Sequence, residues 1–347
     1  MNDLRNIIQN KMNEGVNNNV FPGATYAIIY KGTIIKDFVG YKSLYPVKEE
    51  NNIDTIYDLA SLTKVLVTNT LIGKLLEDKI IGLDDLVKNY IKEFKHDDIT
   101  IKDLLTHSSG LPANVNWMHI KTKEEYLNLI LNVDKVFPRH SKALYSDIGF
   151  IILGVLIERI TNESLDQLAS KHIFKSLEMN ETMYNPCEIE RCAPTELEGD
   201  IYVKGYVHDR KARLFNGIAG HAGVFSTVTD MIKFAQLILD EGVYKDKQII
   251  SKETIELWYK PTFVDDTQRY RTIGWIEGKR STVCDNISSK AVYHQGFTGN
   301  RLLIDKGNEI AIVILSNRVH PTRNNNAFGE FFGEVATLIY ENLIISN

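Results

Sequence analysis

The hydrophobic and polar positions of this chain divide it into strand-rich ends and a helix-rich middle. Residues 24–41, "ATYAIIYKGTIIKDFVGY", hold two apolar, β-branched and aromatic runs on either side of Lys31-Gly32. This pattern predicts two strands joined by a tight turn. Comparable runs return late in the chain, at 271–278, 291–296 and 300–317. They predict an antiparallel meander with a hairpin turn at residues 306–308.

Helical spacing of apolar residues fills the segment between these ends. The run from Ser61 to about Lys79 has helix-like spacing and no internal proline. Helices are also expected over 2–14, 227–242 (ending on Gly242 as a C-cap) and about 326–342. Capping boxes predict three more helix starts, at Thr100 with Asp103, Thr122 with Glu125, and Ser164 with Gln167. A loop-rich region is expected over about 181–222.

These elements predict an α/β (α+β) fold. One antiparallel sheet is built from both chain ends and flanked by helices, and a mostly helical subdomain is inserted between them. We expect one domain over 1–347. Its sheet-containing region covers about 20–60 and 245–347, and its mostly helical region covers about 61–244.

Composition narrows the class of protein. The chain has 347 residues, 44% of them hydrophobic and 24% charged, and a net charge of −5 with scattered lysines. A nucleic-acid partner is therefore not expected. The polar start of the chain lacks a secretory h-region, and the apolar run at 149–157 is too short for a stable membrane insertion. Three cysteines without a C-x-x-C pair indicate reduced thiols. The chain as written is expected to be soluble and cytoplasmic, with a cell-envelope role still open.

The first candidate for chemistry is "SLTK" at the head of an apolar run. If a helix begins near Ser61, Lys64 lies one turn later on the same face, within reach of the serine oxygen. A lysine desolvated in a pocket loses its proton more easily and can act as a base. The alternative is an ordinary N-cap serine followed by a solvated lysine, and the motif alone does not decide between them.

The second candidate is Tyr145-Ser146-Asp147, just before another apolar helix. The phenol would relay a proton, and Asp147 would be a polar anchor beside it. A tyrosine that only packs is the alternative. The same Y-x-[DN] spacing occurs at Tyr244 and Tyr340, but those segments are not placed like an interior site.

The third candidate is His294-Gln295-Gly296 at the end of a predicted strand. We expect Gly296 to let substrate backbone approach the strand edge. The next backbone N–H, that of Phe297, would pair with the N–H of Ser61 as an oxyanion hole. The alternative is a glycine-containing turn with a histidine at its rim.

In this order the three motifs form a variant of the S-x-x-K, S-D-N and K-T-G set of class A β-lactamases and penicillin-binding proteins. The variant resembles the class C β-lactamase branch, in which a tyrosine leads the second motif and which also holds D-amino-acid peptidases and serine esterases. The segments "LLTHSSGLP" at 104–112, 219–239 and 316–323 are similar as well, so the resemblance covers most of 20–340. The last two segments most resemble exported N-acetylmuramyl-L-alanine amidases and weak penicillin-binding carboxypeptidases.

The chain departs from this family at two motif positions. Asp147 stands where asparagine is commoner, and its carboxylate would prefer a cationic or hydrogen-bond-donating substrate group. His294 and Gln295 replace a Lys-Thr pair, and a partly charged imidazole would hold a substrate carboxylate more weakly. Both changes argue against efficient β-lactamase activity. His221 is expected to line the pocket or support its loop, and the pair His208-Asp209 is a surface turn or a second contact for a muropeptide.

The resemblance implies acyl transfer by Ser61, with Lys64 kept neutral as its base and Tyr145 as the proton relay. Asp147, His294, Gly296 and His221 are the expected substrate-binding residues, with no metal or organic cofactor. The expected substrate is a peptidoglycan-derived amide, cleaved by an amidase or D-alanyl-D-alanine carboxypeptidase activity. Hydrolysis of small esters is the second expected activity, and hydrolysis of β-lactams is the third. β-Lactams are also expected as covalent ligands. A penicillin-sensing module without turnover stays open, and a glycosidase with paired carboxylates is not testable from sequence.

Overall fold

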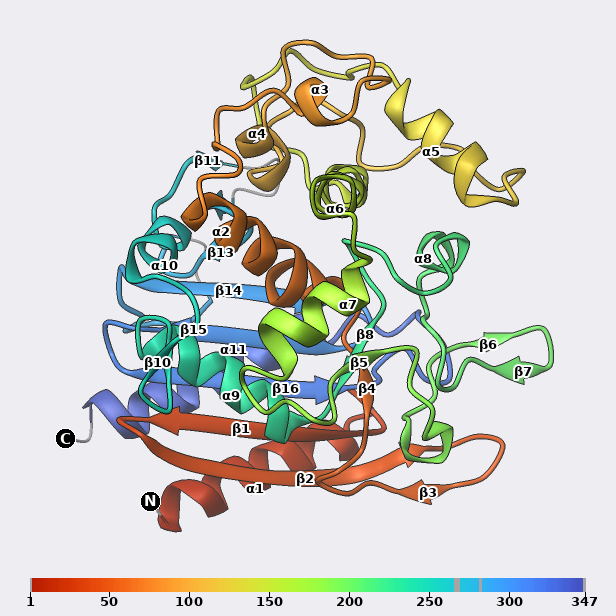
Figure 1. Cartoon of the computed structure of the whole chain (residues 1–347). Helices are drawn as coiled ribbons and strands as arrows, with labels where there is room; N and C mark the ends of the chain where they lie inside the picture. Colours follow the sequence, from red (N-terminus) through yellow and green to blue (C-terminus); the bar gives the residue numbers. More distant parts are fainter. Residues whose placement is uncertain (1, 265–268, 281–282, 346–347) are drawn as a thin grey trace.

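The centre of the molecule is a nine-stranded antiparallel sheet (Figure 1). The computed structural model describes residues 2–264, 269–280 and 283–345. In spatial order the strands are β11 (Phe263–Val264), β12 (Tyr270–Arg271), β13 (Ile276–Glu277), β14 (Ala291–Gly296), β15 (Asn300–Asp305), β16 (Ile310–Ser316), β1 (Gly23–Tyr30), β2 (Thr33–Ser43) and β3 (Glu49–Glu50). Strand β1 pairs with β16, so the two chain ends meet within the sheet, as the sequence predicted.

The alternation of side chains along the central strands explains why both faces of the sheet are covered. On β1, Tyr26 and Ile28 belong to one hydrophobic cluster, and Ala27 and Ile29 belong to the other. The turn between β1 and β2 has positive φ at Lys31 (47°) and at the glycine after it (76°). Positive φ at both central residues fits a type I′ hairpin, whose twist matches the flanking strands. The predicted turn is confirmed.

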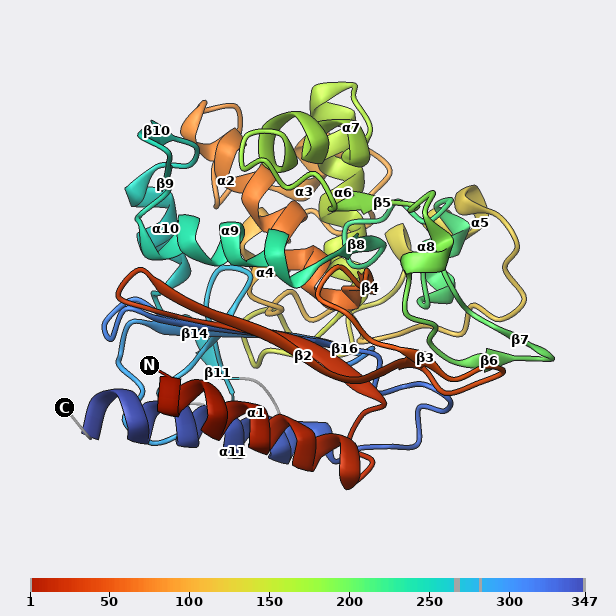
Figure 2. The ribbon, with the colours of Figure 1, turned by 90° about the horizontal axis from the view of Figure 1, so that it is seen from below.

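Two helix layers enclose the sheet. Figure 2 shows α1 (Asn2–Asn17) and α11 (Phe328–Tyr340) together on one face, and the other helices on the opposite face. Helix α9 (Val228–Leu239) packs on β1 and β16 from that opposite face. It ends near Gly242, whose φ of 88° fits the expected C-cap. The fold class and the flanking helices are as the sequence predicted.

The segment between the sheet halves is mostly helical. Its helices are α2 (Thr70–Glu77), α3 (Val87–Tyr90), α4 (Ile101–Leu105), α5 (Lys123–Leu131), α6 (Asp147–Thr161), α7 (Leu165–Ala169) and α8 (Arg210–Leu214), with α10 (Lys252–Trp258) after α9. The three predicted capping boxes at the starts of α4, α5 and α7 are all present. Each satisfies backbone N–H groups that would otherwise lack partners.

Short strands inside this segment were not predicted. A small sheet joins β4 (Tyr57–Asp58), β8 (Val224–Ser226) and β5 (Met183–Tyr184), and hairpins join β6 (Leu197–Glu198) to β7 (Ile201–Tyr202) and β9 (Val243–Tyr244) to β10 (Lys247–Gln248). Strands of two or three residues give too short an alternation to be seen in sequence. The expected loop-rich region 181–222 therefore contains β5, β6, β7 and α8.

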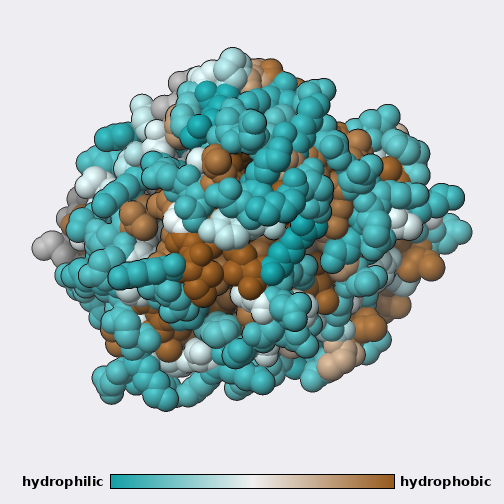
Figure 3. Space-filling view, turned by 45° about the horizontal axis from the view of Figure 1, so that its top comes forward, coloured by the Kyte–Doolittle hydropathy of each residue, from teal (hydrophilic) through white to brown (hydrophobic). Residues whose placement is uncertain are grey.

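The molecular surface is that of an ordinary globular protein. Figure 3 shows a mostly hydrophilic face with hydrophobic residues gathered near its middle. Among the described residues, no helix has both the length and the apolar character needed to cross a bilayer. The three cysteines are free thiols, as expected.

Candidate active site

Ser61 lies in a strained turn that follows strand β4. The residue before it, Ala60, has φ of 46°, a conformation that non-glycine residues seldom adopt. The carboxylate of Asp58 stabilises this turn by accepting a hydrogen bond from the Ala60 N–H at 2.8 Å. The turn therefore fixes the direction in which the Ser61 side chain leaves the backbone.

The helix that carries Ser61 and Lys64 differs from the one expected. A 3₁₀ turn covers Ala60–Leu62, a π-helical stretch covers Lys64–Asn69, and regular α-helix begins only at Thr70. The sequence predicted a continuous helix because apolar spacing does not distinguish 3₁₀ and π turns from α-helix. Short π segments occur often at functional sites.

The predicted contact between Ser61 and Lys64 is present. Lys64 is fully buried, and its Nζ donates a hydrogen bond to Ser61 Oγ at 3.0 Å. Ser61 itself is half-buried and lines two neighbouring cavities. A hydroxyl that contacts an amine and also faces open space is placed as a nucleophile requires.

The charge of Lys64 differs from the expectation. Its Nζ also donates to Asp147 Oδ1 at 2.8 Å and to the carbonyl oxygen of His221 at 3.2 Å. Burial lowers the pKa of Lys64, but the Asp147 carboxylate and the Tyr145 phenol outweigh burial and raise that pKa above its ordinary value. The expected neutral amine is therefore wrong for the resting site, where Lys64 is an ammonium.

Asp147 is held by two cations rather than facing a substrate cation. Lys64 contacts one carboxylate oxygen, and Lys211 contacts the other at 2.5 Å. Burial raises the pKa of Asp147, but Lys64 and Lys211 outweigh burial and keep it well below its usual range. The carboxylate is an ionised partner of both lysines. The expectation that it prefers a cationic substrate group does not fit this arrangement.

Tyr145 shares the site with Ser61. It lies two residues before α6, and its ring centroid is 5.0 Å from Lys64 Nζ. The ring also packs 4.8 Å from His107 and lies 5.2 Å from the Arg271 guanidinium. Ser61 and Tyr145 line the same two cavities, so the serine, the lysine and the phenol converge at one place.

The end of β14 lies directly against the turn before Ser61. A Cβ atom added to Gly296 would overlap the carbonyl oxygen of Leu59, well inside the closest approach that Cβ atoms make. Gly296 therefore serves strand-to-turn packing, and because it also lines the cavity beside Ser61, its expected role of admitting substrate backbone stays a prediction. The carbonyl oxygen of Asp58 accepts hydrogen bonds from Thr298 Oγ1 at 2.7 Å and Asn300 Nδ2 at 2.8 Å. These contacts tie the Phe297 turn to the Ser61 turn, while the Phe297 N–H as an oxyanion donor stays a prediction.

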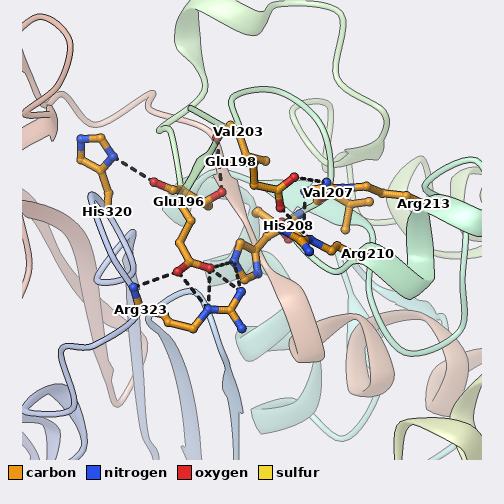
Figure 4. A network of polar contacts seen from close by, with 11 residues as sticks. Glu196, Glu198, Val203, Val207, His208, Arg210, Arg213, His320 and Arg323 are labelled. Atoms are coloured by element: carbon orange, nitrogen blue, oxygen red, sulfur yellow. Dashed lines mark hydrogen bonds and ion pairs between the residues drawn. The ribbon is translucent and has the colours of Figure 1, made fainter. Parts of the chain in front are cut away.

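The Phe297 ring packs against a charged network, and Figure 4 shows the part of this network formed by Glu196, His208 and Arg323. His208 stacks on this ring with centroids 5.6 Å apart, and the guanidinium groups of Arg318 and Arg323 lie 4.9 and 5.4 Å from its centroid. Glu196 contacts His208 Nε2 at 2.7 Å and Arg323 Nε at 2.7 Å, which fixes two of these three groups. The pair His208-Asp209 is thus part of the site wall, although the sequence favoured a surface turn.

His294 is a neutral wall residue. It is 1% exposed, and both ring nitrogens are without a hydrogen-bond partner among the described residues. Burial, followed by Lys64 and Arg271, keeps the pKa of His294 well below its usual range. The expected partly charged imidazole is therefore wrong, because burial and neighbouring cations both disfavour its charged form.

Arginines supply the positive charge that His294 does not. The cavity beside Ser61, about 310 Å³, is lined by Ser61, Tyr145, Arg269, Arg271, Ile276, His294, Gln295, Gly296, Phe297, Arg301 and Arg318. We call it the arginine cavity. Burial and then Arg318 and Arg269 lower the pKa of Arg301 to about 10, partly offset by Tyr293. The arginine side chains that line this cavity favour an anionic group there.

A second cavity of about 590 Å³ lies on the other side of Ser61 and Phe297. We call it the wide cavity. Its described lining residues are Ala60, Ser61, Asn114, Trp117, Tyr145, Asp147, Glu196, Leu197, Glu198, His208, Asp209, Arg210, Lys211, Ala222, Phe297 and Arg323. Ser61, Tyr145 and Phe297 line both cavities, so a substrate with its carbonyl at Ser61 would extend into each.

His221 lies behind these cavities. It is 1% exposed and is not among the described residues that line either cavity. Its Nε2 pairs with Asp209 at 3.0 Å, while its carbonyl oxygen accepts from Lys64. This placement agrees with the expected support of a loop, and the substrate contact expected of His221 stays a prediction.

One group of side chains has the spacing of metal ligands. Ligand atoms of Asp147, Asp209 and His221 lie within 4.8 Å of one another. The ammonium groups of Lys64 and Lys211 already contact both oxygens of Asp147, and Lys211 lies 3.7 Å from Asp209. These cations occupy the positions around the carboxylates, so the group is better described as an ion-pair cluster.

The sequence analysis did not identify Lys211 or the arginines that line the arginine cavity. Lys211 lies in "HDRKARL", a charged stretch with no motif spacing, and the arginines come from separate strands and loops. Lys211 follows His208-Asp209, so that polar pair was the only local signal. Arg269, Arg271 and Arg301 had none, because only the assembled sheet brings them together, and Arg318 stood only within the segment 316–323 that carried the resemblance.

Comparison with known proteins identifies the family. Residues 4–329 match the Beta-lactamase family. The chain is 29% identical to an N-acetylmuramyl-L-alanine amidase of Bacillus subtilis (strain 168), over 92% of this chain and 85% of that protein. It is 32% identical to a putative D-alanyl-D-alanine carboxypeptidase of Escherichia coli O157:H7, over 82% and 74%. The structure of a class C β-lactamase matches with a TM-score of 0.82, 17% identity and coverage of 98% and 96%.

The chain therefore belongs to the Beta-lactamase family. The structural match shows the β-lactamase fold that the three motifs implied. Within this family, its relatives identify the chain as a hydrolase.

Proposed function

We propose that the protein is a serine hydrolase that cleaves an amide bond of a peptidoglycan fragment through an acyl-enzyme on Ser61. The observation that carries the proposal is the 3.0 Å hydrogen bond from Lys64 Nζ to Ser61 Oγ, with Tyr145 lining the same cavities. Alone, the Ser61 hydroxyl is a weak nucleophile, and an adjacent base is what activates such a group.

The geometry supports the following acylation step. Lys64 in its amine form accepts the Ser61 proton as Oγ attacks the substrate carbonyl carbon. The backbone N–H groups of Ser61 and Phe297 hold the oxyanion that forms, and Tyr145 relays the proton to the leaving nitrogen. Water then attacks the acyl-enzyme and releases Ser61. Because Asp147 favours the ammonium form of Lys64, the reactive amine is a minor form at neutral pH.

Two observations support a peptidoglycan fragment as substrate. The relatives are named for N-acetylmuramyl-L-alanine and D-alanyl-D-alanine. We expect the peptide that this chain cleaves to carry a free carboxylate. The arginine cavity directly beside Ser61 suits such a carboxylate. The wide cavity leaves room for the rest of a muropeptide. This function implies a role in cell-envelope turnover, with β-lactams as covalent ligands.

Steady-state hydrolysis of four compounds tests this proposal: N-acetylmuramyl-L-alanine peptide, a D-alanyl-D-alanine peptide, a nitrophenyl ester and a chromogenic cephalosporin. The expected result is fastest turnover of a muropeptide amide, lost in Ser61→Ala. Ester turnover alone would contradict the substrate class. Labelling of Ser61 by a fluorescent β-lactam, with no turnover of any compound, would support a sensor instead.

A further inference from the structure

Lys211 makes a contact that the sequence motifs do not account for. It comes from α8, on a segment distant in sequence from Ser61, Lys64 and Tyr145. Its ammonium holds one oxygen of Asp147 while Lys64 holds the other at 2.8 Å. The Lys211 side chain is only 11% exposed. One carboxylate is therefore shared between the candidate base and a second buried cation.

These contacts form a closed ring around the base. Lys211 lies 3.7 Å from Asp209, Asp209 pairs with His221 Nε2 at 3.0 Å, and the His221 carbonyl oxygen accepts from Lys64 at 3.2 Å. Two carboxylates and two ammonium groups thus alternate in one partly buried cluster. Removal of any one charge leaves the others unbalanced in a low-dielectric setting.

The short helix α8 is anchored so that Lys211 stays in place. Asp209 caps its N-terminus by accepting from the Ala212 N–H at 2.9 Å. Figure 4 shows Glu198 bonded to the two arginines on either side of Lys211. Arg210 contacts Glu198 at 3.1 Å, and Arg213 contacts it at 2.6 Å. The contact of Lys211 with Asp147 is therefore built into the fold.

Other titratable groups also face Lys64, and the effect of Lys211 adds to theirs. The titratable groups near Lys64 from the packed elements are Tyr145, Asp147, His221, His107, His294 and Arg271. His107 and His294 are buried, and burial keeps the pKa of each well below its ordinary value, so they are neutral. Asp147 is thus the anion that Lys64 contacts, and Lys211 is the cation that competes for it.

We propose that Lys211 is a positioning residue that holds the second oxygen of Asp147 and thereby sets how firmly Lys64 keeps its proton. The proposal rests on the function proposed above, in which the amine of Lys64 activates Ser61. Lys211 does not touch the reacting atoms. It makes Ser61 reactive at a lower pH than Asp147 alone would allow.

The sign of the effect follows from simple electrostatics. An anion close to Lys64 favours its charged form, and a second cation close by disfavours it. Without Lys211, Asp147 would act on Lys64 alone, and the pKa of Lys64 would rise further. The ascending limb of the pH–rate profile would then move to higher pH. A shift of about one pH unit would reduce the rate below the limb about tenfold.

The test measures the second-order rate constant for labelling of Ser61 by a fluorophosphonate, by intact mass, from pH 5.5 to 11.5, so that the ascending limb and the start of its plateau are both covered. Lys211→Met is expected to move the ascending limb upward by about one unit. Lys211→Arg retains the cation and is expected to keep the wild-type limb. Asp147→Asn removes the anion and is expected to move the limb downward.

Lys233→Met is the matched control, since Lys233 also pairs with a buried aspartate, Asp230 at 2.8 Å, but on α9 outside both cavities. It is expected to leave the limb unchanged. An equal fall in rate at every pH in Lys211→Met, without a shift, would overturn the inference and show a structural role. If Lys211→Met does not fold, Lys211→Gln carries the same prediction with a smaller shift. Failure of wild-type Ser61 to label would overturn the proposed function instead, so the two failures are distinguishable.

Discussion

Gly296 at the end of β14 packs directly on the carbonyl oxygen of Leu59, two residues before Ser61. This contact joins two segments that lie more than 200 residues apart in sequence and sets the Phe297 turn beside the candidate nucleophile. The Thr298 and Asn300 side chains add hydrogen bonds to the carbonyl oxygen of Asp58. The proposed oxyanion hole can therefore form here only because residue 296 is a glycine, which has no side chain to clash with the carbonyl oxygen of Leu59.

Gly296→Ala is expected to displace the strand from the Ser61 turn. Overpacking of this kind costs about 1–3 kcal/mol of stability. Movement of the Phe297 N–H away from the oxyanion would lower kcat by about 10²-fold. Steady-state kinetics and urea unfolding measure the two effects. Gly329→Ala is the control, because its Cβ would meet no atom nearer than 3.9 Å. A Gly296→Ala protein with wild-type kcat would contradict this role.

Arg318 is expected to bind a carboxylate of the substrate. It lines the arginine cavity, and its Nη1 donates to the Asn325 carbonyl oxygen at 2.5 Å, which fixes the guanidinium. A hydrogen bond to a charged group contributes about 1.5–3 kcal/mol. Arg318→Gln should therefore lower kcat/KM for a carboxylated peptide by about 10- to 100-fold and leave a neutral nitrophenyl ester nearly unaffected.

Arg159→Gln is the control for that experiment, since Arg159 pairs with Glu93 outside both cavities. An equal loss with both substrates in Arg318→Gln would show damage to the site wall rather than loss of carboxylate binding. Raised salt should weaken the peptide reaction more than the ester reaction.

Glu196 is expected to make stability depend on pH. Burial raises the pKa of Glu196, but Arg323 and His208 outweigh burial and lower it to about 2. The pKa of Glu196 is lower in the folded chain than in the unfolded chain, where it is near 4.5. The ionised carboxylate therefore stabilises the fold above about pH 4.5, and this stabilisation is lost as the pH falls toward 2. With solvent screening, the contribution is on the order of 1–2 kcal/mol.

Glu196→Gln should therefore be less stable than wild type at pH 7, and the difference should narrow between pH 4.5 and 3. Urea unfolding at pH 7, 5 and 3.5 measures this. Glu190→Gln is the control, because the Glu190 side chain is 92% exposed and its pair with Lys204 should contribute little. A difference for Glu196→Gln that stays constant with pH would contradict an electrostatic origin.

The sequence predicted the sheet and most helices because their signals are local. The runs around Lys31-Gly32 and the three capping boxes need only neighbouring residues to be recognised. The 3₁₀ and π turns around Ser61 were missed because their side-chain spacing resembles that of an α-helix. Strands of two residues carry too little alternation to be detected.

Part of the candidate site was predicted, because that part also has local signals in the sequence. Ser61, Lys64 and Tyr145 were found because their spacing and order form motifs. The charge of Lys64 was predicted wrongly, because it depends on the balance between burial and the contacts with Asp147 and Tyr145, which meet Lys64 only in the folded chain. The neutral state of His294 likewise depends on burial, which its position at the end of a strand did not reveal.

The most direct test of the central claim is peptide mapping of a covalent adduct formed with a fluorophosphonate. We predict an adduct on the peptide that contains Ser61, absent in Ser61→Ala and formed at least 10²-fold more slowly in Lys64→Met, the range expected for loss of a general base. An adduct on another residue, or one that forms on Ser61 at the wild-type rate without Lys64, would contradict the account.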